Sequence, residues 1–599
     1  MLNWRLYRVA LVPLALALAV AAFSLGHRPM PLHSTLAPDA FEGARAFTEL
    51  QSLTARFPDR RPGSRGDQEL ASLIAHRLRS LGGAGGGFSV RLDSFDAQTI
   101  DGSRRLQTVI AERPGSTDAP PILIVAHRDA AAPRSEAELS GTVALLELAR
   151  VFAARETKRT IVLASTSGGS GGDAAAARLA QGGSSRLRGP LDAVVVLGDL
   201  AGTVTRRPLV VPYSDAEGSA PLQLQRTVAD AITHESGIDP GAPSTLGQAI
   251  HLAFPLTVGE QGPLNAAGIP SVLVQVSGER GPSASEPVSE ERLQGFGRAV
   301  LSSLDALDGA PELTHAMHRG VVLQRQTMPA WAIRMVTLAL LLAPLITLAD
   351  GFARMRRRRL PVRRWLLWTL LCALPFFTCA VFAYVLGWLG ILGASPAVPA
   401  LPSAMPFGTT AATAVIAMLL TFALAWLLWS ALVRRVGIGA SPDPEAAPPA
   451  MMIVLLGVAC LAWIGNPLSA LMLIPALHLW LLLASPELRP RRAVAIPIVL
   501  VGLLPLGLLI AFYAHQLGMG PGTAAWTAVM LVAGGHVGIG SALLWSVAGG
   551  CGAAALLIVL RARRLPPAPQ ADGVDVTIRG PLSYAGPGSL GGTESALRR

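Results

Sequence analysis

The chain has 599 residues, of which 51% are hydrophobic and only 15% are charged, and its formal net charge is +11. It is too long for one compact core, and this composition is typical of a protein with a large membrane part. Much of the positive charge is arginine beside apolar segments, and aromatic residues make up only 5%. The excess charge therefore indicates orientation in a lipid bilayer rather than binding to nucleic acid.

The cysteines predict neither a disulfide framework nor a cysteine zinc site. None of the four falls between residues 26 and 328, and no Cys-x-x-Cys pattern occurs. All of them lie in apolar segments: Cys372, Cys379, Cys460 and Cys551.

The N-terminus carries an apolar run over residues 7–25, with Arg5 and Arg8 at its start. Such a run is either a signal peptide or an uncleaved anchor. Because it is long for a signal peptide, we expect residues 1–28 to form a transmembrane anchor with its N-terminus in the cytoplasm. Either interpretation exports the segment that follows.

Residues 40–310 alternate between strand and helix patterns, which predicts an α/β domain with a doubly wound, mostly parallel sheet. The first two strands, joined by a short Asp-Gly-Ser connection, are expected to form an antiparallel hairpin at one edge. Strands are expected near 88–94, 106–112, 121–126, 160–165, 192–198, 208–212 and 270–276. Helices are expected near 41–57, 67–81, 140–154, 173–181, 220–235 and 289–307.

From residue 329 to 562 the sequence predicts a polytopic α-helical transmembrane bundle. Apolar runs lie near 330–349, 365–393, 408–433, 450–465, 467–485, 493–514 and 523–560. Arginine clusters at 354–364, 434–435 and 489–492 should be cytoplasmic. This predicts a multi-pass protein of the cell membrane with the α/β domain on the extracytoplasmic side.

The apolar runs at the end of this region allow more than one membrane topology. The run at 523–560 is too long for one span and is divisible into two. Three spans after Arg492 would leave Arg561 outside the cytoplasm, against the charge rule, so the topology of the last spans stays open. The tail at 565–599 is rich in Pro, Gly and Ser and is expected to be disordered.

A candidate site lies where the apolar strand 122–126 ends in His127-Arg-Asp129, because ligands of open α/β sheets bind at the carboxyl ends of strands. Here the domain resembles the zinc exopeptidases of the leucyl-aminopeptidase and glutamate-carboxypeptidase type. The resemblance covers about residues 40–310. Its motifs are Arg61-Pro-Gly-Ser, His127-x-Asp129, Ser140-Gly, Leu197-Gly-Asp199-Leu-Ala-Gly and Ala267-Gly-Ile-Pro-Ser.

The resemblance implies two zinc ions, an aspartate that bridges them and a glutamate that acts as general base. In this chain Ala137 stands at the bridging position, and Gly169 and Ser170 stand where the family has paired glutamates. Gln261 replaces the last histidine ligand. We therefore expect that catalysis has been lost and that no cofactor is bound, with zinc as the cofactor if the site is active.

His127 and Asp199 remain as possible metal ligands, with Asp129 orienting His127. Glu136, Glu138 and Glu260 are possible substitutes for the missing ligands. Simpler interpretations are a hydrogen-bonded histidine at a strand end, an aspartate that caps its own turn and solvated loop glutamates. A serine nucleophile at Ser170, served by His234 or His251, and a phosphate-binding glycine loop are weaker alternatives.

Three functions follow from these patterns. The favoured one is a membrane-embedded pseudopeptidase that binds a peptide or a membrane-protein partner; its layout resembles the metal-less, peptidase-like membrane subunit of the GPI transamidase. The first alternative is an active zinc-dependent aminopeptidase-like metallopeptidase. The second is a transporter with an accessory domain, against which the near absence of charged residues inside the apolar runs argues.

Overall fold

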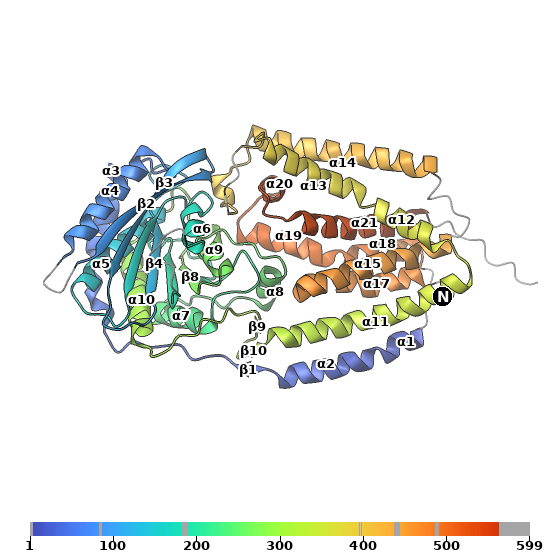
Figure 1. Cartoon of the computed structure of the whole chain (residues 1–599), viewed down its shortest axis with the longest axis horizontal. Helices are drawn as coiled ribbons and strands as arrows, with labels where there is room; N and C mark the ends of the chain where they lie inside the picture. The colour runs from blue at the N-terminus through green and yellow to red at the C-terminus, as the bar shows by residue number, and fades with distance from the viewer. Residues whose placement is uncertain are drawn as a thin grey trace, which may run out of the picture.

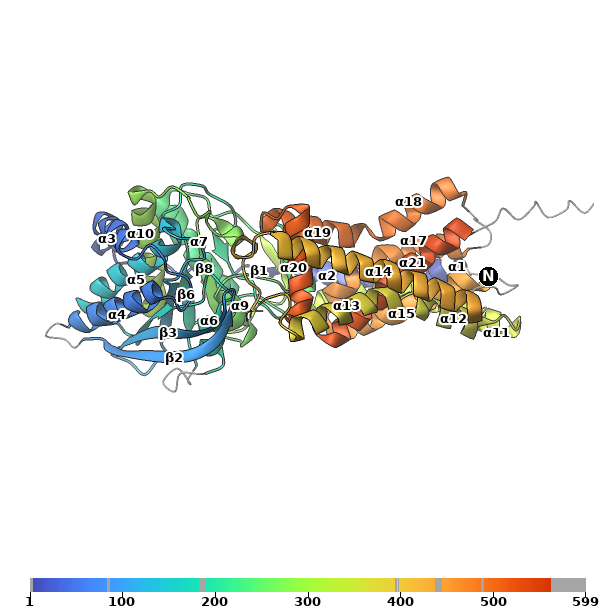
Figure 2. The ribbon, with the colours of Figure 1, turned by 90° about the horizontal axis from the view of Figure 1, so that it is seen from above.

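The computed structural model describes residues 4–82, 87–182, 190–393, 396, 398–436, 444–485 and 490–561. A compact α/β part lies at one end and a bundle of long helices at the other (Figure 1). Seen from above, the two parts lie end to end along the longest axis (Figure 2). The predicted disordered tail falls outside the described residues.

The α/β part is built on a seven-stranded mixed sheet with the order β2-β3-β5-β4-β6-β8-β7. The four central strands are parallel, whereas β2 and β3 at one edge and β7 at the other are antiparallel. The predicted hairpin at the edge is therefore present, and the prediction of a mostly parallel sheet holds for the centre. The strands are β2 (Ser89–Thr99), β3 (Gly102–Arg113), β4 (Ile122–His127), β5 (Ile161–Thr166), β6 (Ala193–Leu197), β7 (Val210–Val211) and β8 (Ser271–Val274).

Both faces of the central strands are buried, as continuous apolar runs predict. In β4, Ile122 and Ile124 join the larger core cluster, while Leu123 and Val125 join the smaller cluster on the opposite face. Helices α6 (Ala174–Ala180) and α9 (Gln261–Ala266) contribute to the smaller cluster. The larger cluster contains residues of α3 (Gly43–Arg56), α4 (Arg65–Ser80), α5 (Glu136–Ala153), α7 (Leu222–Ser236) and α10 (Glu290–Gly309).

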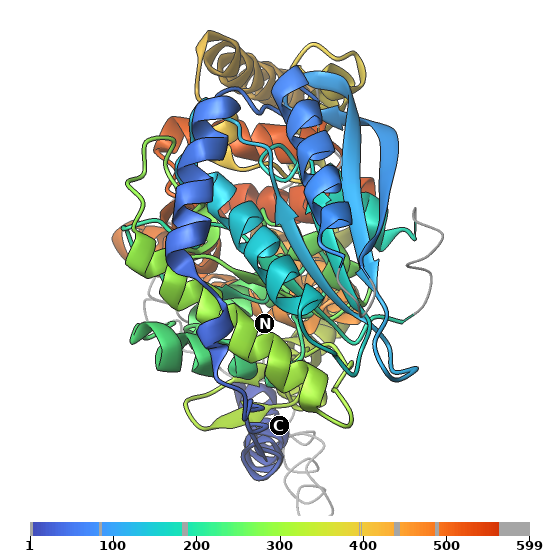
Figure 3. The same cartoon turned by 90° about the vertical axis from the view of Figure 1, so that its left-hand side faces the viewer.

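Figure 3 faces the end of the molecule far from the bundle, where α3, α4, α5 and α10 lie side by side. Helix α5 approaches the sheet most closely at Gly141. A Cβ atom at this position would lie 2.3 Å from the carbonyl oxygen of Leu197 in β6. This contact lets the N-terminal turn of α5 lie directly beside the carboxyl ends of the central strands.

The helical part contains seven candidate membrane spans among the described residues, and eight if the bent pair α18–α19 counts as one. The pair is bent by 48° at its break. The helices are α1 (Trp4–Val9), α2 (Leu11–Phe23), α11 (Ala330–Arg357), α12 (Val362–Leu371), α13 (Leu374–Trp388), α14 (Thr409–Val436), α15 (Ala447–Gly465), α16 (Pro467–Leu471), α17 (Ile474–Ala484), α18 (Arg492–Gly502), α19 (Leu504–Gln516), α20 (Pro521–Ala533) and α21 (Ile539–Arg561).

The last apolar run forms two helices, but only α21 is long enough to cross a bilayer. Helix α20 has 13 residues, a length of about 20 Å, against a hydrocarbon thickness of about 30 Å. It lies at the end of the bundle that faces the α/β part (Figures 1 and 2). Two candidate spans rather than three therefore follow Arg492, and α21 ends at the same end of the bundle at which α18 begins (Figure 1).

Several contacts join the α/β part to the bundle, and two of them lie near α2, α11 and α16. A three-stranded antiparallel sheet joins the end of α2 to the start of α11; its strands are β1 (Gly26–His27), β9 (Val321–Val322) and β10 (Gln326–Met328). Helix α8 (Thr245–Ala253) packs on α16. There the Nδ2 atom of Asn466 donates a hydrogen bond of 2.6 Å to the carbonyl oxygen of Leu252.

We predict that Gly141→Ala destabilises the protein. The new methyl group collides with the backbone of β6, so we expect a loss of about 1–3 kcal/mol despite the better helix propensity of alanine. The control is Gly309→Ala, at the exposed end of α10, where a Cβ atom meets nothing within 4 Å. Thermal unfolding of the full chain in detergent measures both; equal midpoints for the two variants would contradict the prediction.

Candidate functional site

The candidate site lies at the carboxyl ends of three neighbouring strands. β4 ends at His127, β5 ends at Thr166, and Asp199 follows β6 by two residues. β4 pairs with β5 on one side and with β6 on the other, in parallel register. The topology therefore places these three residues at the carboxyl ends of neighbouring strands.

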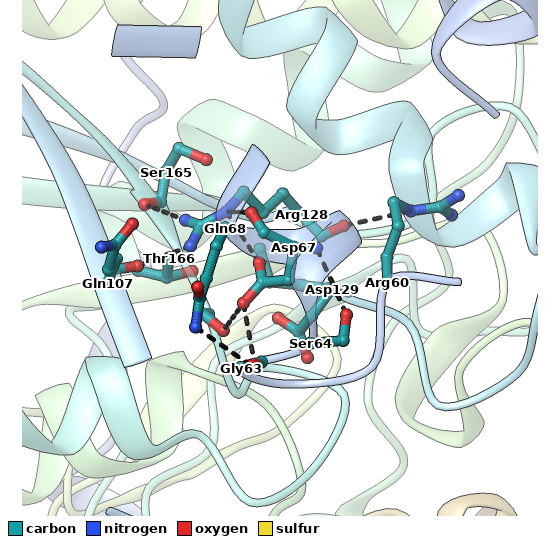
Figure 4. A network of polar contacts seen from close by, with 12 residues as sticks. Arg60, Gly63, Ser64, Asp67, Gln68, Gln107, Arg128, Asp129, Ser165 and Thr166 are labelled. Atoms are coloured by element: carbon teal, nitrogen blue, oxygen red, sulfur yellow. Dashed lines mark hydrogen bonds and ion pairs between the residues drawn. The ribbon is translucent and has the colours of Figure 1, made fainter. Parts of the chain in front are cut away.

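A buried ion pair supports this edge (Figure 4). Arg128, which has no exposed surface, places its Nε atom 2.8 Å from the Oδ1 atom of Asp67 in α4. The same guanidinium donates hydrogen bonds to the carbonyl oxygens of Ser165 and Gln107. Arg60 donates to the carbonyl oxygen of Arg128. The arginine between His127 and Asp129 thus fixes the strand end from which both project.

The glycine-rich loop after β5 folds over Asp129. The Oδ1 atom of Asp129 accepts hydrogen bonds from the amides of Gly168 and Gly169, at 2.9 and 3.1 Å. Its Oδ2 atom accepts from the amide of Ser170 at 3.0 Å and from the Ser170 hydroxyl at 2.5 Å. All the acceptor capacity of Asp129 is used to hold this loop, which suits an orienting role better than metal binding.

The loop leaves no room for a side chain at position 169. A Cβ atom on Gly169 would lie 2.4 Å from the Cβ atom of His127. The backbone therefore contacts His127 directly at the position where the resemblance implies a glutamate. Restoring that glutamate would require the loop or His127 to move.

Neither histidine predicted as a base contacts Ser170. Its hydroxyl donates to Asp129. His251 lies 3.3 Å from Glu279, and His234 lies 3.6 Å from Asp230, so both predicted bases contact other carboxylates. The arrangement lacks the serine–histidine contact that nucleophilic catalysis requires.

His127 forms an ion pair with Glu260. Its Nδ1 atom lies 3.8 Å from the Oε2 atom of Glu260, whose Oε1 atom accepts a hydrogen bond of 2.6 Å from the hydroxyl of Thr166. Burial by itself would lower the pKa of His127, but the carboxylates of Glu260, Asp129 and Glu138 outweigh it and raise the pKa to about 9. His127 is therefore an imidazolium at neutral pH.

The glutamates around the site are not all solvated loop charges, and that interpretation is wrong for two of them. Glu260 is 2% exposed, and Glu138, in the first turn of α5, is 9% exposed. Burial raises the pKa of the Glu138 carboxyl to about 7. Only Glu136 is partly exposed. The hydrophobic periodicity of α5 does not identify Glu138 as a buried residue of the site. The burial of Glu138 comes from the packing of the first turn of α5 near His127, which belongs to another element.

Ala137 and Gln261, which stand where the resemblance implies two metal ligands, are fully buried. The Nε2 atom of Gln261 donates a hydrogen bond of 2.9 Å to the Thr257 hydroxyl. Asp199 accepts hydrogen bonds from the amides of Ala201 and Gly202, and burial raises its pKa to about 6. Asp199 thus caps the turn that follows β6.

Nowhere in the described ranges do three His, Cys, Asp or Glu side chains form a group that could hold a metal ion. His127 is paired, Asp129 is saturated and Asp199 caps a turn. These residues do not fit the two-zinc centre that the resemblance implies.

A small pocket of about 30 Å³ lies beside His127, enough for one or two water molecules. Leu401, from the loop between α13 and α14, is part of its wall. Gly172 meets the same loop, since a Cβ atom there would lie 2.1 Å from the Cβ atom of Pro396. The polar side chains of the wall include His127, Asp173, Glu260, Gln261, Gln275 and Glu279.

No protein-family model and no curated protein matches the chain. Solved structures that resemble it include a zinc aminopeptidase from Bacillus subtilis (12% identity, TM-score 0.32, covering 44% of this chain and 94% of that one). Others are a glutaminyl cyclase from Porphyromonas gingivalis (15%, 0.30, 44% and 98%) and an aminopeptidase from Aneurinibacillus sp. strain AM-1 (12%, 0.34, 47% and 97%). At these values the similarity carries no conclusion about activity.

The ion pair predicts a pH-dependent effect of His127→Gln. The pKa of His127 is raised from 6.5 to about 9 on folding, so its stabilisation is complete below pH 6.5 and is lost as the pH rises through 9. We expect this variant to lose up to about 3 kcal/mol of stability at pH 6 and little of it at pH 10. Unfolding midpoints across this range measure the difference.

His234→Gln is the control, because that side chain is 72% exposed. It should leave the midpoint unchanged. A His127→Gln deficit that is the same at pH 6 and at pH 10 would show that the pair contributes packing only.

Proposed function

We propose that this chain is a multi-pass membrane protein whose exported, zinc-exopeptidase-like domain binds a peptide or a partner subunit without cleaving it. The observation that carries the proposal is the ion pair between His127 and Glu260. By raising the pKa of His127 this pair opposes metal binding, because a metal ion must displace the proton. The layout shared with the peptidase-like subunit of the GPI transamidase agrees with a binding role but transfers no substrate.

The chemistry of the neighbouring residues supports the loss of catalysis. Zinc-dependent hydrolysis needs at least three protein ligands for each ion and a base for the bound water. The loop that would carry the base, residues 167–172, contains only glycine and serine, and three of its amides are bonded to Asp129. Gln261 stands at the position of the last histidine and is bonded to Thr257.

One arrangement favours the second candidate, an active zinc aminopeptidase-like hydrolase. Glu138 and Glu260 are buried close to His127, as substitutes for the lost ligands would have to be. Zinc would have to displace the proton of His127 and separate it from Glu260. The two candidates therefore differ in a measurable property, the zinc content of the folded protein.

We predict that purified full-length protein, equilibrated with zinc and then washed, retains no more zinc than its His127→Ala variant. We also expect no release of p-nitroaniline from aminoacyl p-nitroanilides by either protein. Elemental analysis and absorbance measure the two quantities. Two zinc ions per chain together with hydrolysis, both abolished by His127→Ala, would establish the metallopeptidase instead.

The proposed location rests on the arginines of the bundle. The last turns of α11, α14 and α21 carry arginine, and α18 begins at Arg492. These four helix ends lie at the end of the bundle away from the α/β part (Figure 1). Because arginine-rich ends are retained in the cytoplasm, the α/β part would lie on the opposite side of the membrane.

A labelling experiment tests this location in a chain whose four native cysteines are replaced by alanine. We predict that a membrane-impermeant maleimide labels Ser52→Cys, exposed on α3, in intact cells. Val436→Cys, 54% exposed at the end of α14, should be labelled only after permeabilisation. The reverse pattern would place the α/β part in the cytoplasm.

A further inference from the structure

An arginine-rich turn joins α11 to α12 at the end of the bundle away from the α/β part (Figure 1). Seven of the eleven residues from 354 to 364 are arginine, and none of the eleven is acidic. Arg354 pairs with Asp350 at 2.9 Å. Five further arginines are exposed and have no ion-pair partner among the described residues: Arg356, Arg357, Arg358, Arg359 and Arg363. The turn therefore presents a positive surface that the protein itself does not neutralise.

The usual roles of arginine at a helix end account for only part of this charge. Cations in the last turn stabilise the carbonyl end of a helix, and α11 already has three arginines there. Retention of a helix end in the cytoplasm needs no more, because α14 ends with two arginines and α21 with one. The surplus lies in the turn itself, at Arg358, Arg359 and Arg363.

The backbone of the turn places an arginine where glycine would be more stable. The amide of Leu360 donates to the carbonyl oxygen of Met355 at 3.1 Å, and the amide of Arg359 donates to that of Arg356 at 3.0 Å. These two bonds form a Schellman ending, whose left-handed residue is usually glycine. Arg359 takes that position with φ 55°. A charged side chain held in this backbone conformation points to a role outside the fold of the turn.

An apolar stripe continues from the turn along α12, which forms one candidate span together with α13. Arg363 is followed on the same helix face by Leu367, Leu370 and Leu374, at spacings of four, three and four residues. All three leucines are exposed. From Arg363 to Leu374 the helix rises about 16 Å, about half the hydrocarbon thickness of a bilayer. The stripe therefore has a charged head and an apolar stem as long as one lipid leaflet.

We propose that the α11–α12 turn binds acidic phospholipids, with their phosphates at the arginines and an acyl chain along the leucine stripe. The planar guanidinium matches two phosphate oxygens at once, and basic segments beside a membrane span attract anionic headgroups. Each arginine can pair with its own headgroup in a bilayer, so the surface needs no single point of convergence. This inference goes beyond the binding role of the α/β part; it rests on the part of the proposed function that places the bundle in a bilayer.

Lipid retention by the full chain tests the proposal. The protein is placed in nanodiscs of equal parts dioleoylphosphatidylglycerol and dioleoylphosphatidylcholine and released into detergent, and the lipids still bound are counted by native mass spectrometry. We expect phosphatidylglycerol to be retained about tenfold over phosphatidylcholine. Arg357→Gln/Arg358→Gln should lower this ratio about fivefold or more, because two phosphate partners are removed. The control is Arg104→Gln/Arg105→Gln, on two exposed arginines of β3, which should leave the ratio unchanged.

Arg359→Gly separates lipid binding from the stability of the turn. In detergent without acidic lipid this variant should unfold at the same temperature as the unaltered chain or higher, because glycine suits the left-handed conformation. It should nevertheless retain less phosphatidylglycerol. A lower unfolding midpoint together with unchanged retention would show that Arg359 serves the fold of the turn, and would overturn the proposal.

Two further arms complete the test. Glycerol 3-phosphate, a phosphate without acyl chains, should not displace the retained phosphatidylglycerol; displacement would assign the arginines to a soluble phosphate compound and overturn the lipid proposal. Equal retention of the two lipids by the unaltered chain would overturn it as well. The labelling of Ser52→Cys keeps the two proposals apart. Labelling in intact cells without lipid selectivity refutes the lipid proposal alone, whereas the reverse labelling pattern with lipid selectivity refutes the proposed location alone.

Discussion

The buried pair of Arg128 and Asp67 is the contact on which the site depends. Arg128 is fully buried and bonded to α4, β3 and β5, so it ties the end of β4 to three other elements. Asp67 also accepts hydrogen bonds from the amide of Gly63 and the hydroxyl of Ser167. The pair therefore positions both the turn before α4 and the first residue of the glycine loop. Removing one partner would leave an uncompensated buried charge.

Much of the fold could be predicted from the sequence, because its strands are short apolar runs and its helices have one apolar face. The parallel centre and the edge hairpin followed from these patterns. Helices α8 and α9 were not predicted, since they are short and lie between turns. Ser244, whose hydroxyl accepts from the amide of Gly247, was a usable signal for the start of α8.

The site was less predictable than the fold for a physical reason. His127 ends β4 and Asp199 follows β6, so their placement at the carboxyl ends of neighbouring strands could be anticipated. Glu260, Asp173 and Glu279 follow no strand directly, and their positions depend on packing between distant segments. Gly169, in contrast, was singled out from the sequence, but its contact with His127 was not predicted. Its lack of a side chain was read as a lost base, and the structure adds that the glycine permits the close contact with His127.

The bundle contributes to the pocket rather than only anchoring it. Helix α19 ends beside Glu279, where Gln516 donates a hydrogen bond to the same carboxylate oxygen that pairs with His251. The hydroxyl of Tyr513 bonds to the carbonyl oxygen of Phe254 at the end of α8. Because α19 is the second half of the bent pair α18–α19, these polar contacts join that pair directly to a residue of the pocket wall. Glu279 is thus held by residues of both the α/β part and the bundle.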